Sequence, residues 1–231
     1  MPEPRLPLLP VVPSGEGIPP ILHRIWVGGE PPAWVIDSWM RWNDFVNESA
    51  HDWEVISWTD FTIEDTPLER IAAIADHYNL PPRGKADLLR VVAVSLYGGF
   101  YMDADVVPLR SLDDLVFKPE IPLWTTSHAE SREQQVLWNG GFGAERGSQY
   151  LSDILDHADR GLGRRVVNEH FLAGPRAYRR YLPEDALTEW DFQFEASAAE
   201  RRAMAGQGQL DMEDLRRKYP ARLKHIGPRE S

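Results

Sequence analysis

The sequence predicts an α/β fold, and three observations support this prediction. Short apolar runs alternate along the chain with stretches whose apolar residues recur at helical spacing. The 231 residues are enough for one large domain or two small ones. Apolar residues make up 42% of the chain and charged residues 26%, which is typical of a globular protein with a packed core.

The first 17 residues are expected to form an irregular arm. Seven prolines fall within the first twenty positions, and they break the apolar helix that a signal peptide needs. We therefore interpret this stretch as an arm rather than a targeting sequence, and we expect a cytoplasmic protein. The most apolar stretch, Leu88 to Met102, contains Arg90 and a glycine pair, so no membrane span is expected.

Three elements are predicted between residues 21 and 58. Ile21–Val27 is an apolar run that ends at Gly28-Gly29, as a first strand would. Apolar residues at helical spacing then predict a helix over 33–46. Trp53–Trp58 is predicted to be a second strand.

The next helix has a clear start signal. Thr66 is an expected N-cap, Pro67 suits the first helical position, and Glu69 completes a capping box. This helix should run to about Tyr78.

The most informative stretch follows at residues 84–114. Lys85–Tyr97 is expected to be a mostly buried helix that ends at Gly98 in a left-handed conformation. Phe100–Ala104 is a predicted third strand, and Pro108 ends the segment after it. The remaining expected strands are 123–126 and 136–138, and the remaining expected helices are 148–160, 175–181 and about 196–205.

Asp103-Ala104-Asp105 is the strongest chemical signal. Side chains alternate along a strand, so Tyr101, Asp103 and, if the extension persists, Asp105 should face one way. Two carboxylates this close repel each other unless a cation lies near them, and oxygen ligands suit Mg²⁺ or Mn²⁺. The alternative is a solvated strand end or turn.

Two further features could belong to a binding site. Asp87 and Arg90 share a helix face, where they either form a structural ion pair or hold a sugar hydroxyl and a phosphate. Trp26 ends the first strand, where its ring could stack on a nucleobase or fill the core. We interpret the other eight tryptophans, Trp34 included, as core packing.

Charge and composition exclude several classes of function. The net charge of −11 argues against nucleic acid as a partner, because phosphate backbones attract Lys and Arg. The chain has no cysteine, which excludes disulfides, thiolate zinc sites, iron–sulfur clusters and cysteine nucleophiles.

As a set, these residues resemble the DXD sugar-transferase family. That family includes the yeast-type α-1,6-mannosyltransferases of glycosyltransferase family 32, and the catalytic cores of clostridial glucosylating toxins are similar. The resemblance covers residues 18–115 well and 116–231 loosely. The segments that carry it are Ile18–Gly29, Trp53–Asp60, Ala86-Asp87-x-x-Arg90, Tyr97-Gly98-Gly99-x-Tyr101-x-Asp103-x-Asp105 and Pro108-Leu109.

The resemblance implies a fold and several donor contacts. The fold is the GT-A nucleotide-diphospho-sugar transferase type, a mixed central sheet flanked by helices in a single domain over 18–231. Residues 18–115 would bind donor and metal, and 116–231 would form the acceptor side. Trp26 would stack on the donor base, Asp87 and Arg90 would contact the donor sugar and phosphate, and Tyr101 would lie near the diphosphate.

The resemblance also implies a metal site. Asp103 would contact the sugar or ribose and reach Mn²⁺ or Mg²⁺ through water, and Asp105 would bind the metal directly. Asn139 is the candidate in a loop that faces the reacting centre. His225 is a candidate third metal ligand, although a histidine near a chain end is often simply exposed. The tryptophan that follows this histidine in relatives has no counterpart before Ser231.

The implied activity is a metal-dependent transfer of a sugar, with retention, from a UDP- or GDP-sugar to a glycan, lipid or protein hydroxyl. Asp87, Arg90 and Asp103 would take part in catalysis. Two alternatives remain open. One is a catalytically weak or inactive module that binds a nucleotide sugar. The other is a haloacid-dehalogenase-type phosphatase with Asp103 as its nucleophile, although that motif normally follows the first strand.

Overall fold

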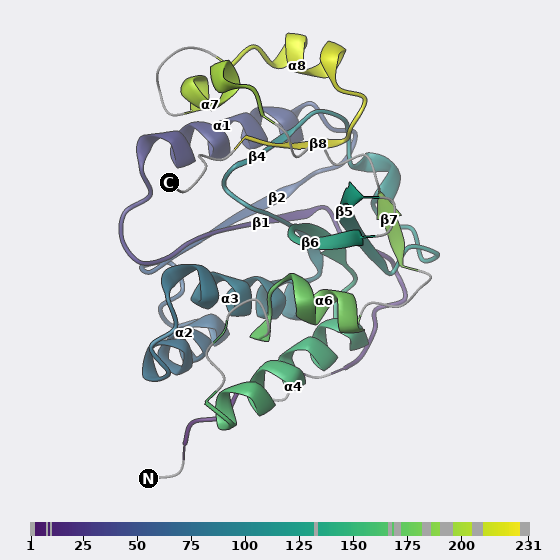
Figure 1. Ribbon diagram of the computed structural model, residues 1–231. Helices are drawn as coiled ribbons and strands as arrows, with labels where there is room; N and C mark the ends of the chain where they lie inside the picture. Colours follow the sequence, from purple (N-terminus) through teal and green to yellow (C-terminus); the bar gives the residue numbers. More distant parts are fainter. Residues whose placement is uncertain are drawn as a thin grey trace.

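A six-stranded mixed sheet forms the centre of the computed structural model, with helices on both faces (Figure 1). The described residues are 3–7, 9, 11–131, 134–165, 168, 172–181, 186–189, 196–204 and 210–226. The strand order is β2-β1-β3-β6-β5-β7, with β1 parallel to both β2 and β3, and β6 antiparallel to β3 and β5. The α/β class and the mixed sheet are thus confirmed.

The elements of the first half lie close to their predicted bounds. They are β1 (Ile21–Trp26), α1 (Ala33–Asn47), β2 (Glu54–Thr59), α2 (Pro67–His77), α3 (Pro82–Tyr97), β3 (Gly99–Met102) and β4 (Val106–Pro108). Helix α3 begins three residues before its expected start, because a proline is well accommodated in the first turn of a helix. Strand β3 ends at Met102, two residues earlier than expected.

The second half holds longer strands than predicted and several short elements that were not predicted. The elements are β5 (Leu123–Ser131), β6 (Gln134–Ala144), α4 (Gln149–Gly163), α6 (Pro175–Tyr181), β7 (Leu187–Glu189), α7 (Ala198–Met204), α8 (Met212–Lys218) and β8 (Leu223–His225). A 3₁₀ turn covers Asp113–Leu115. Residue 205, the expected end of α7, lies outside the described residues, as do residues 1, 2, 8 and 10 of the arm.

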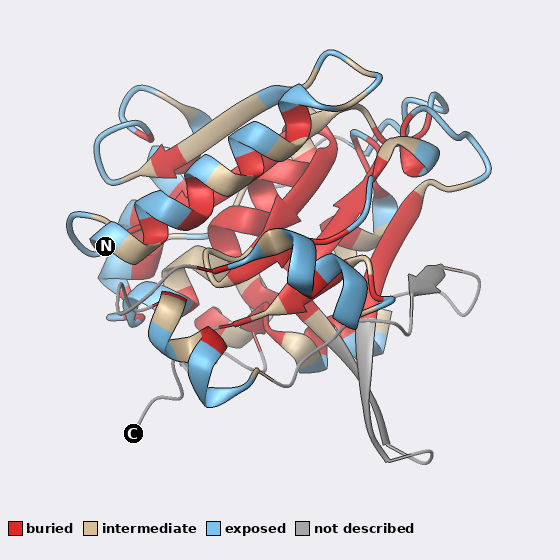
Figure 2. Ribbon diagram, turned by 90° about the horizontal axis from the view of Figure 1, so that it is seen from above, coloured by how far each residue is buried: buried red, intermediate tan, exposed pale blue. Residues whose placement is uncertain are grey.

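Alternation along β3 divides the core into two layers. Tyr101 packs with α2, α3, α4 and α6 on one face of the sheet. Phe100 and Met102 pack with Trp42 of α1 and Trp124 of β5 on the other face. Buried residues accordingly concentrate in the strands and on the inner sides of the helices (Figure 2).

Two predicted helix ends differ in detail from expectation. Thr66 caps α2 by accepting a hydrogen bond from the Leu68 backbone N–H, but the Glu69 carboxylate accepts from Asp65 instead of from Thr66. Gly98 has the expected positive φ of +72°. Its ψ of −172° makes it extended rather than left-handed helical, so the chain passes directly from α3 into β3.

The described part of the arm packs on the domain. The Leu6 side chain is buried, and its backbone N–H donates to Oδ1 of Asp159 in α4 at 2.8 Å. Arg5 forms an ion pair with the same aspartate, and Gly15 donates to Glu145. Among the described residues, no helix combines the length and apolar character needed to span a membrane.

The last described elements form a separate layer over α1. Strand β8 pairs antiparallel with β4, so Val106 lies opposite His225. Lys224 is fully buried, and its Nζ atom lies 3.4 Å from Oε2 of Glu200 in α7. This ion pair, the hydrogen bonds from Ser197 N–H and Tyr219 O–H, and the amine of Lys218 lower the pKa of Glu200 to about 2, although burial alone would raise it.

Candidate functional site

The two aspartates of the DXD motif lie in a turn that follows β3. The Asp103 backbone N–H donates to the Gly140 carbonyl at 2.7 Å, and Val106 N–H donates to the Asp103 carbonyl at 3.1 Å. The Tyr101 and Asp103 side chains face the same way, as expected, and the Tyr101 hydroxyl reaches Asp103. The extended backbone does not persist to Asp105, so Asp105 does not join them on that face. The turn gives the two carboxylates different partners.

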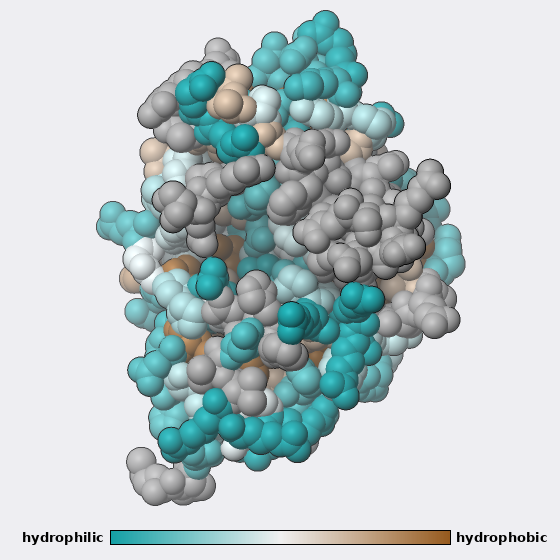
Figure 3. Space-filling model, viewed as in Figure 1, coloured by the Kyte–Doolittle hydropathy of each residue, from teal (hydrophilic) through white to brown (hydrophobic). Residues whose placement is uncertain are grey.

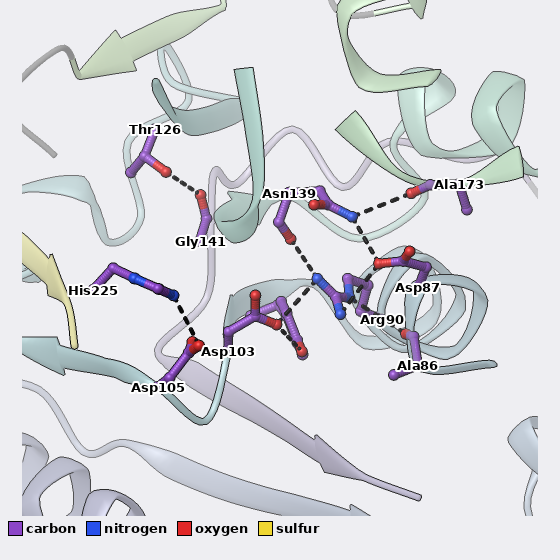
Figure 4. Close-up of polar contacts among 11 residues, drawn as sticks. Ala86, Asp87, Arg90, Asp103, Asp105, Thr126, Asn139, Gly141, Ala173 and His225 are labelled. Atoms are coloured by element: carbon purple, nitrogen blue, oxygen red, sulfur yellow. Dashed lines mark hydrogen bonds and ion pairs between the residues drawn. The ribbon is translucent and has the colours of Figure 1, made fainter. Parts of the chain in front are cut away.

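Asp103 belongs to a buried polar network (Figure 4). Its Oδ1 atom accepts a hydrogen bond from the Tyr101 hydroxyl at 2.7 Å and lies 3.1 Å from Nη1 of Arg90. Burial raises the pKa of Asp103, and the negative charge of Asp105 raises it further, while Arg90 acts in the opposite direction.

Arg90 is the centre of this network. Its Nη2 atom lies 3.2 Å from Oδ1 of Asp87, one turn away on α3. Its Nη1 donates to the backbone carbonyl of Asn139 at 2.9 Å. The guanidinium carbon lies 4.4 Å from the centre of the Tyr101 ring. Burial alone would lower the pKa of Arg90, but the carboxylates of Asp103 and Asp87 raise it, so the guanidinium remains charged.

Asn139 reaches this network because β6 bulges there. Thr125 pairs with Phe142 and Thr126 pairs with Trp138, so residues 139–141 are extra in β6. The Asn139 Nδ2 donates to Oδ1 of Asp87 at 2.7 Å. Bulges redirect side chains in this way, and the Gly140-Gly141 pair within a strand is the sequence signal for one.

His225 lies beside Asp105. Its Nε2 atom is 2.8 Å from Oδ2 of Asp105, and the Ile226 backbone N–H donates to the Asp105 carbonyl at 2.8 Å. Burial alone would lower the pKa of His225, whereas the hydrogen bond and the charge of Asp105 raise it. The Trp138 ring meets the His225 ring edge-on, with ring centres 5.7 Å apart.

The aspartates have a chemistry that fits a hard divalent cation. The Oδ1 atom of Asp105 is buried and has no hydrogen-bond partner. Mg²⁺ commonly binds through one or two carboxylates together with waters and substrate phosphates. Within the described segments, no three Asp, Glu, His or Cys side chains lie close enough together to form a complete metal site. Asp103, Asp105 and His225 are therefore the residues that could hold such an ion together with a bound diphosphate.

A cavity of about 640 Å³ connects the DXD turn to the end of β1. Arg90, Tyr101, Asp103 and Asp105 are among the residues that line it. The rest of the wall is mainly aromatic and apolar, and it comprises Ile25, Trp26, Val27, Gly28, Trp34, Pro81, Pro82, Arg83, Ala86 and Ala104. On the face shown in Figure 3, apolar side chains are likewise recessed between hydrophilic ones.

Trp26, the base-stacking candidate, has two neighbours here that the sequence pattern did not indicate. Trp34 lines the wall instead of filling the core as expected, and its ring centre is 5.8 Å from that of Trp26. Asp60 fixes the loop between them, because its Oδ2 accepts hydrogen bonds from the N–H groups of Gly28 and Gly29 at 2.8 and 2.9 Å. The position of Asp60 just after β2, at the same sheet end as Gly28, was the available signal.

The structure therefore brings all the sequence-predicted residues to one region. Five of them form one connected polar network: Asp87, Arg90, Tyr101, Asp103 and Asn139. Asp105 and His225 form a second pair on the other side of Asp103. Trp26 lines the same cavity as Arg90, Asp103 and Asp105.

Comparison with known proteins agrees with this geometry. Residues 37–122 match the family described as "Glycosyltransferase sugar-binding region containing DXD motif". Inositol phosphoceramide mannosyltransferase 3 of Schizosaccharomyces pombe is 28% identical over 163 residues, which cover 68% of this chain and 41% of that protein. Inositol phosphoceramide mannosyltransferase 1 of the same yeast is 28% identical over 119 residues, or 48% of this chain and 35% of that protein. The chain thus spans less than half the length of these curated relatives.

A solved structure shows the same fold. The PaToxG glycosyltransferase superposes with a TM-score of 0.53 and 16% identity, covering 89% of this chain and 79% of that one. The GT-A fold implied by the motifs is thereby confirmed. This chain thus has the GT-A fold, and its residues 37–122 resemble a glycosyltransferase sugar-binding region that contains a DXD motif.

Proposed function

We propose that this chain is a metal-dependent glycosyltransferase that moves a sugar from a UDP- or GDP-sugar to an acceptor hydroxyl, with retention of configuration. The cavity carries this proposal, because the aromatic ring of Trp26 and the charged side chains of Arg90, Asp103 and Asp105 line the same space. A nucleotide sugar has matching parts, with a flat base at one end and a diphosphate and sugar at the other. The family match over residues 37–122 supports the assignment.

In this proposal, residues 18–115 bind the donor and the metal. Residues 116–231 form the acceptor side, and they also contribute Asn139 and His225 to the donor and metal site.

Asp87 and Arg90 contact the donor sugar and its phosphate. The Asp87 carboxylate is held by the Asn139 amide and by Arg90, which leaves its oxygens fixed to accept hydrogen bonds from sugar hydroxyls. Arg90 is buried and permanently charged, so it stabilises the negative charge that develops as the diphosphate departs. Tyr101 orients Asp103 through its hydroxyl.

Asp103, Asp105 and His225 are the proposed holders of Mn²⁺ or Mg²⁺. Such an ion, when bound, supplies Lewis-acid neutralisation of charge on the leaving diphosphate. The unpartnered Oδ1 of Asp105 is the protein atom best prepared to contact it.

Retention and the acceptor rest on resemblance. Retention would place the attacking hydroxyl on the face from which the diphosphate leaves. The yeast relatives are named as mannosyltransferases of inositol phosphoceramide, so GDP-mannose and a hydroxyl on a lipid headgroup are the first donor and acceptor to test. Glycan and protein acceptors come next.

The test begins with a thermal-shift screen of UDP- and GDP-sugars with and without Mn²⁺, because a bound donor raises the melting temperature. Sugars that bind are then assayed for metal-dependent hydrolysis and transfer, and the anomeric configuration of the product is read by NMR. Asp105→Asn should lower turnover by about 100-fold or more. Asp44→Asn, on the exposed side of α1, is the matched control and should change nothing.

The outcomes separate the proposal from its alternative. Full turnover by Asp105→Asn would overturn the metal assignment. Binding of a nucleotide sugar without hydrolysis or transfer under any condition would favour the inactive nucleotide-sugar-binding module. A chain that binds none of the donors would contradict both.

A further inference from the structure

Trp34 stands apart from the other tryptophans on α1. It lies in the first turn of the helix and lines the cavity, whereas Trp39 and Trp42 are buried in the protein and are not part of the cavity wall. Its ring meets the Trp26 ring at an angle of 88°, with ring centres 5.8 Å apart. The two rings therefore form a right-angled aromatic corner in the cavity wall.

We propose that Trp34 is a second binding residue of the nucleobase subsite. This inference rests on the proposed function and deepens it. A base stacked parallel to the Trp26 ring would lie perpendicular to the Trp34 ring, so Trp34 limits how far the base can slide. Perpendicular and offset-stacked contacts are both favourable aromatic geometries. The edge-to-face contact also fixes the orientation of Trp26 before a donor binds.

The position of Trp34 is set by residues from the other end of the chain. Its remaining surface packs against an apolar cluster built by β4 and the C-terminal elements, which comprises Val107, Leu109, Met204, Leu210, Leu215, Ala221 and Ile226. Ile226 directly follows His225, the residue at Asp105. One cluster thus packs against Trp34 in the cavity wall and includes the residue that follows His225.

The different chemistry of the two sets of lining residues separates base binding from metal binding. The aromatic corner has no role in holding a diphosphate, which would lie with Arg90, Asp103 and Asp105. A ligand without a base therefore reports on the charged residues alone. Pyrophosphate with Mg²⁺ is such a probe, while UDP and GDP with Mg²⁺ report on both sets.

The experiment compares Trp34→Leu, Trp34→Phe and Trp39→Phe by isothermal titration calorimetry with these three probes. Trp39 is the matched control because it lies on the same helix, packs on Arg24 and is not part of the cavity wall. Trp34→Leu should raise the Kd of the better-binding nucleotide about ten-fold and leave the Kd of pyrophosphate unchanged. Trp34→Phe should restore part of the loss, and Trp39→Phe should bind all probes like the wild type.

A double variant tests the link between the two rings. If Trp34 acts partly by orienting Trp26, the losses caused by Trp26→Leu and Trp34→Leu should not multiply in the double variant. An unchanged nucleotide Kd in Trp34→Leu, or an equal loss of pyrophosphate binding, would overturn this inference while leaving the proposed function in place. A wild-type protein that binds neither nucleotide would overturn both.

Discussion

The Nε2 atom of His225 lies 2.8 Å from Oδ2 of Asp105, although the two residues are 120 positions apart in the chain. The contact depends on the pairing of β8 with β4, which sets Val106 opposite His225. It leaves the other oxygen of Asp105 buried and unpartnered. His225 thus fixes one of the two carboxylate oxygens, and in the proposed function the other is the oxygen that would contact a cation.

We therefore expect His225→Gln to weaken divalent-metal binding by about ten-fold or more, since this histidine is a proposed metal holder and also fixes Asp105, and a partner that orients a ligand commonly contributes this much by itself. The melting temperature without metal should stay near that of the wild type, because His225 is only partly buried. Isothermal titration with Mn²⁺ measures the first quantity and a thermal scan the second. Unaltered Mn²⁺ affinity would remove His225 from the site.

Asn139 is expected to act through Asp87. Its Nδ2 donates to the Asp87 carboxylate at 2.7 Å, so Asn139→Asp would place two carboxylates in contact. Repulsion between them should destabilise the fold by about 1–3 kcal/mol and weaken donor binding. Asn139→Ala removes the donor without adding a charge and should cost less in both assays. Chemical denaturation and donor titration distinguish the two, and equal effects of both substitutions would contradict the pairing.

Gly140 and Gly141 offer a matched pair of substitutions. A Cβ atom at Gly140 would lie 2.2 Å from Oδ2 of Asp103 and 2.3 Å from the Trp138 ring. One at Gly141 would lie 3.2 Å from the end of the Leu223 side chain, a flexible neighbour. Gly140→Ala should therefore displace the Asp103 carboxylate and lower activity at least about ten-fold.

Gly141→Ala should retain most of the activity, because the Leu223 side chain can shift by the few tenths of an ångström required. Turnover and melting temperature of the two variants are compared side by side. A similar loss of turnover in both variants would mean that activity depends on the bulge itself and not on the space beside Asp103.

His23 gives the fold a dependence on pH. It is fully buried, with Nε2 2.8 Å from the Gly98 carbonyl and Nδ1 accepting from Trp58 Nε1 at 3.1 Å. Burial lowers its pKa to about 4, so the folded protein holds it neutral while the unfolded chain protonates near pH 6.5. The contribution of the neutral His23 side chain to the free energy of unfolding is constant above pH 6.5 and is lost progressively as the pH falls toward 4.

The size of this effect is about 3 kcal/mol at pH 4, from a shift of roughly 2.5 units. His23→Gln removes the titration, so the difference in unfolding free energy between wild type and variant should shrink by up to this amount between pH 7 and pH 4. Urea denaturation at both pH values measures the difference. If the difference in unfolding free energy between wild type and variant does not change with pH, His23 does not titrate as its burial predicts.

Much of the first half of this protein followed from local patterns. The cap at Thr66, the proline at the start of α2 and the apolar periodicity of α1 are local signals, and the helices lie where those signals put them. Spacing alone also put Asp87 and Arg90 on one face of α3, because residues three apart in a helix are neighbours.

The second half depended more on contacts between distant segments. Strands β4, β7 and β8 have three residues each, which is too short for a period to be recognised, and they exist because a partner strand is present. The bulge at residues 139–141 likewise depends on the pairing of β6 with β5.

The sequence by itself determined the α/β class, the helix that carries Asp87 and Arg90, and the motif that carries Asp103 and Asp105. The tertiary structure decided the partners of Asp87 and Asp105, because Asn139 comes from β6 and His225 from β8. It also moved Trp34 from the expected core to the cavity wall. The physical reason is that helical and strand periods are set by neighbours along the chain, whereas a binding site is assembled from residues far apart in it.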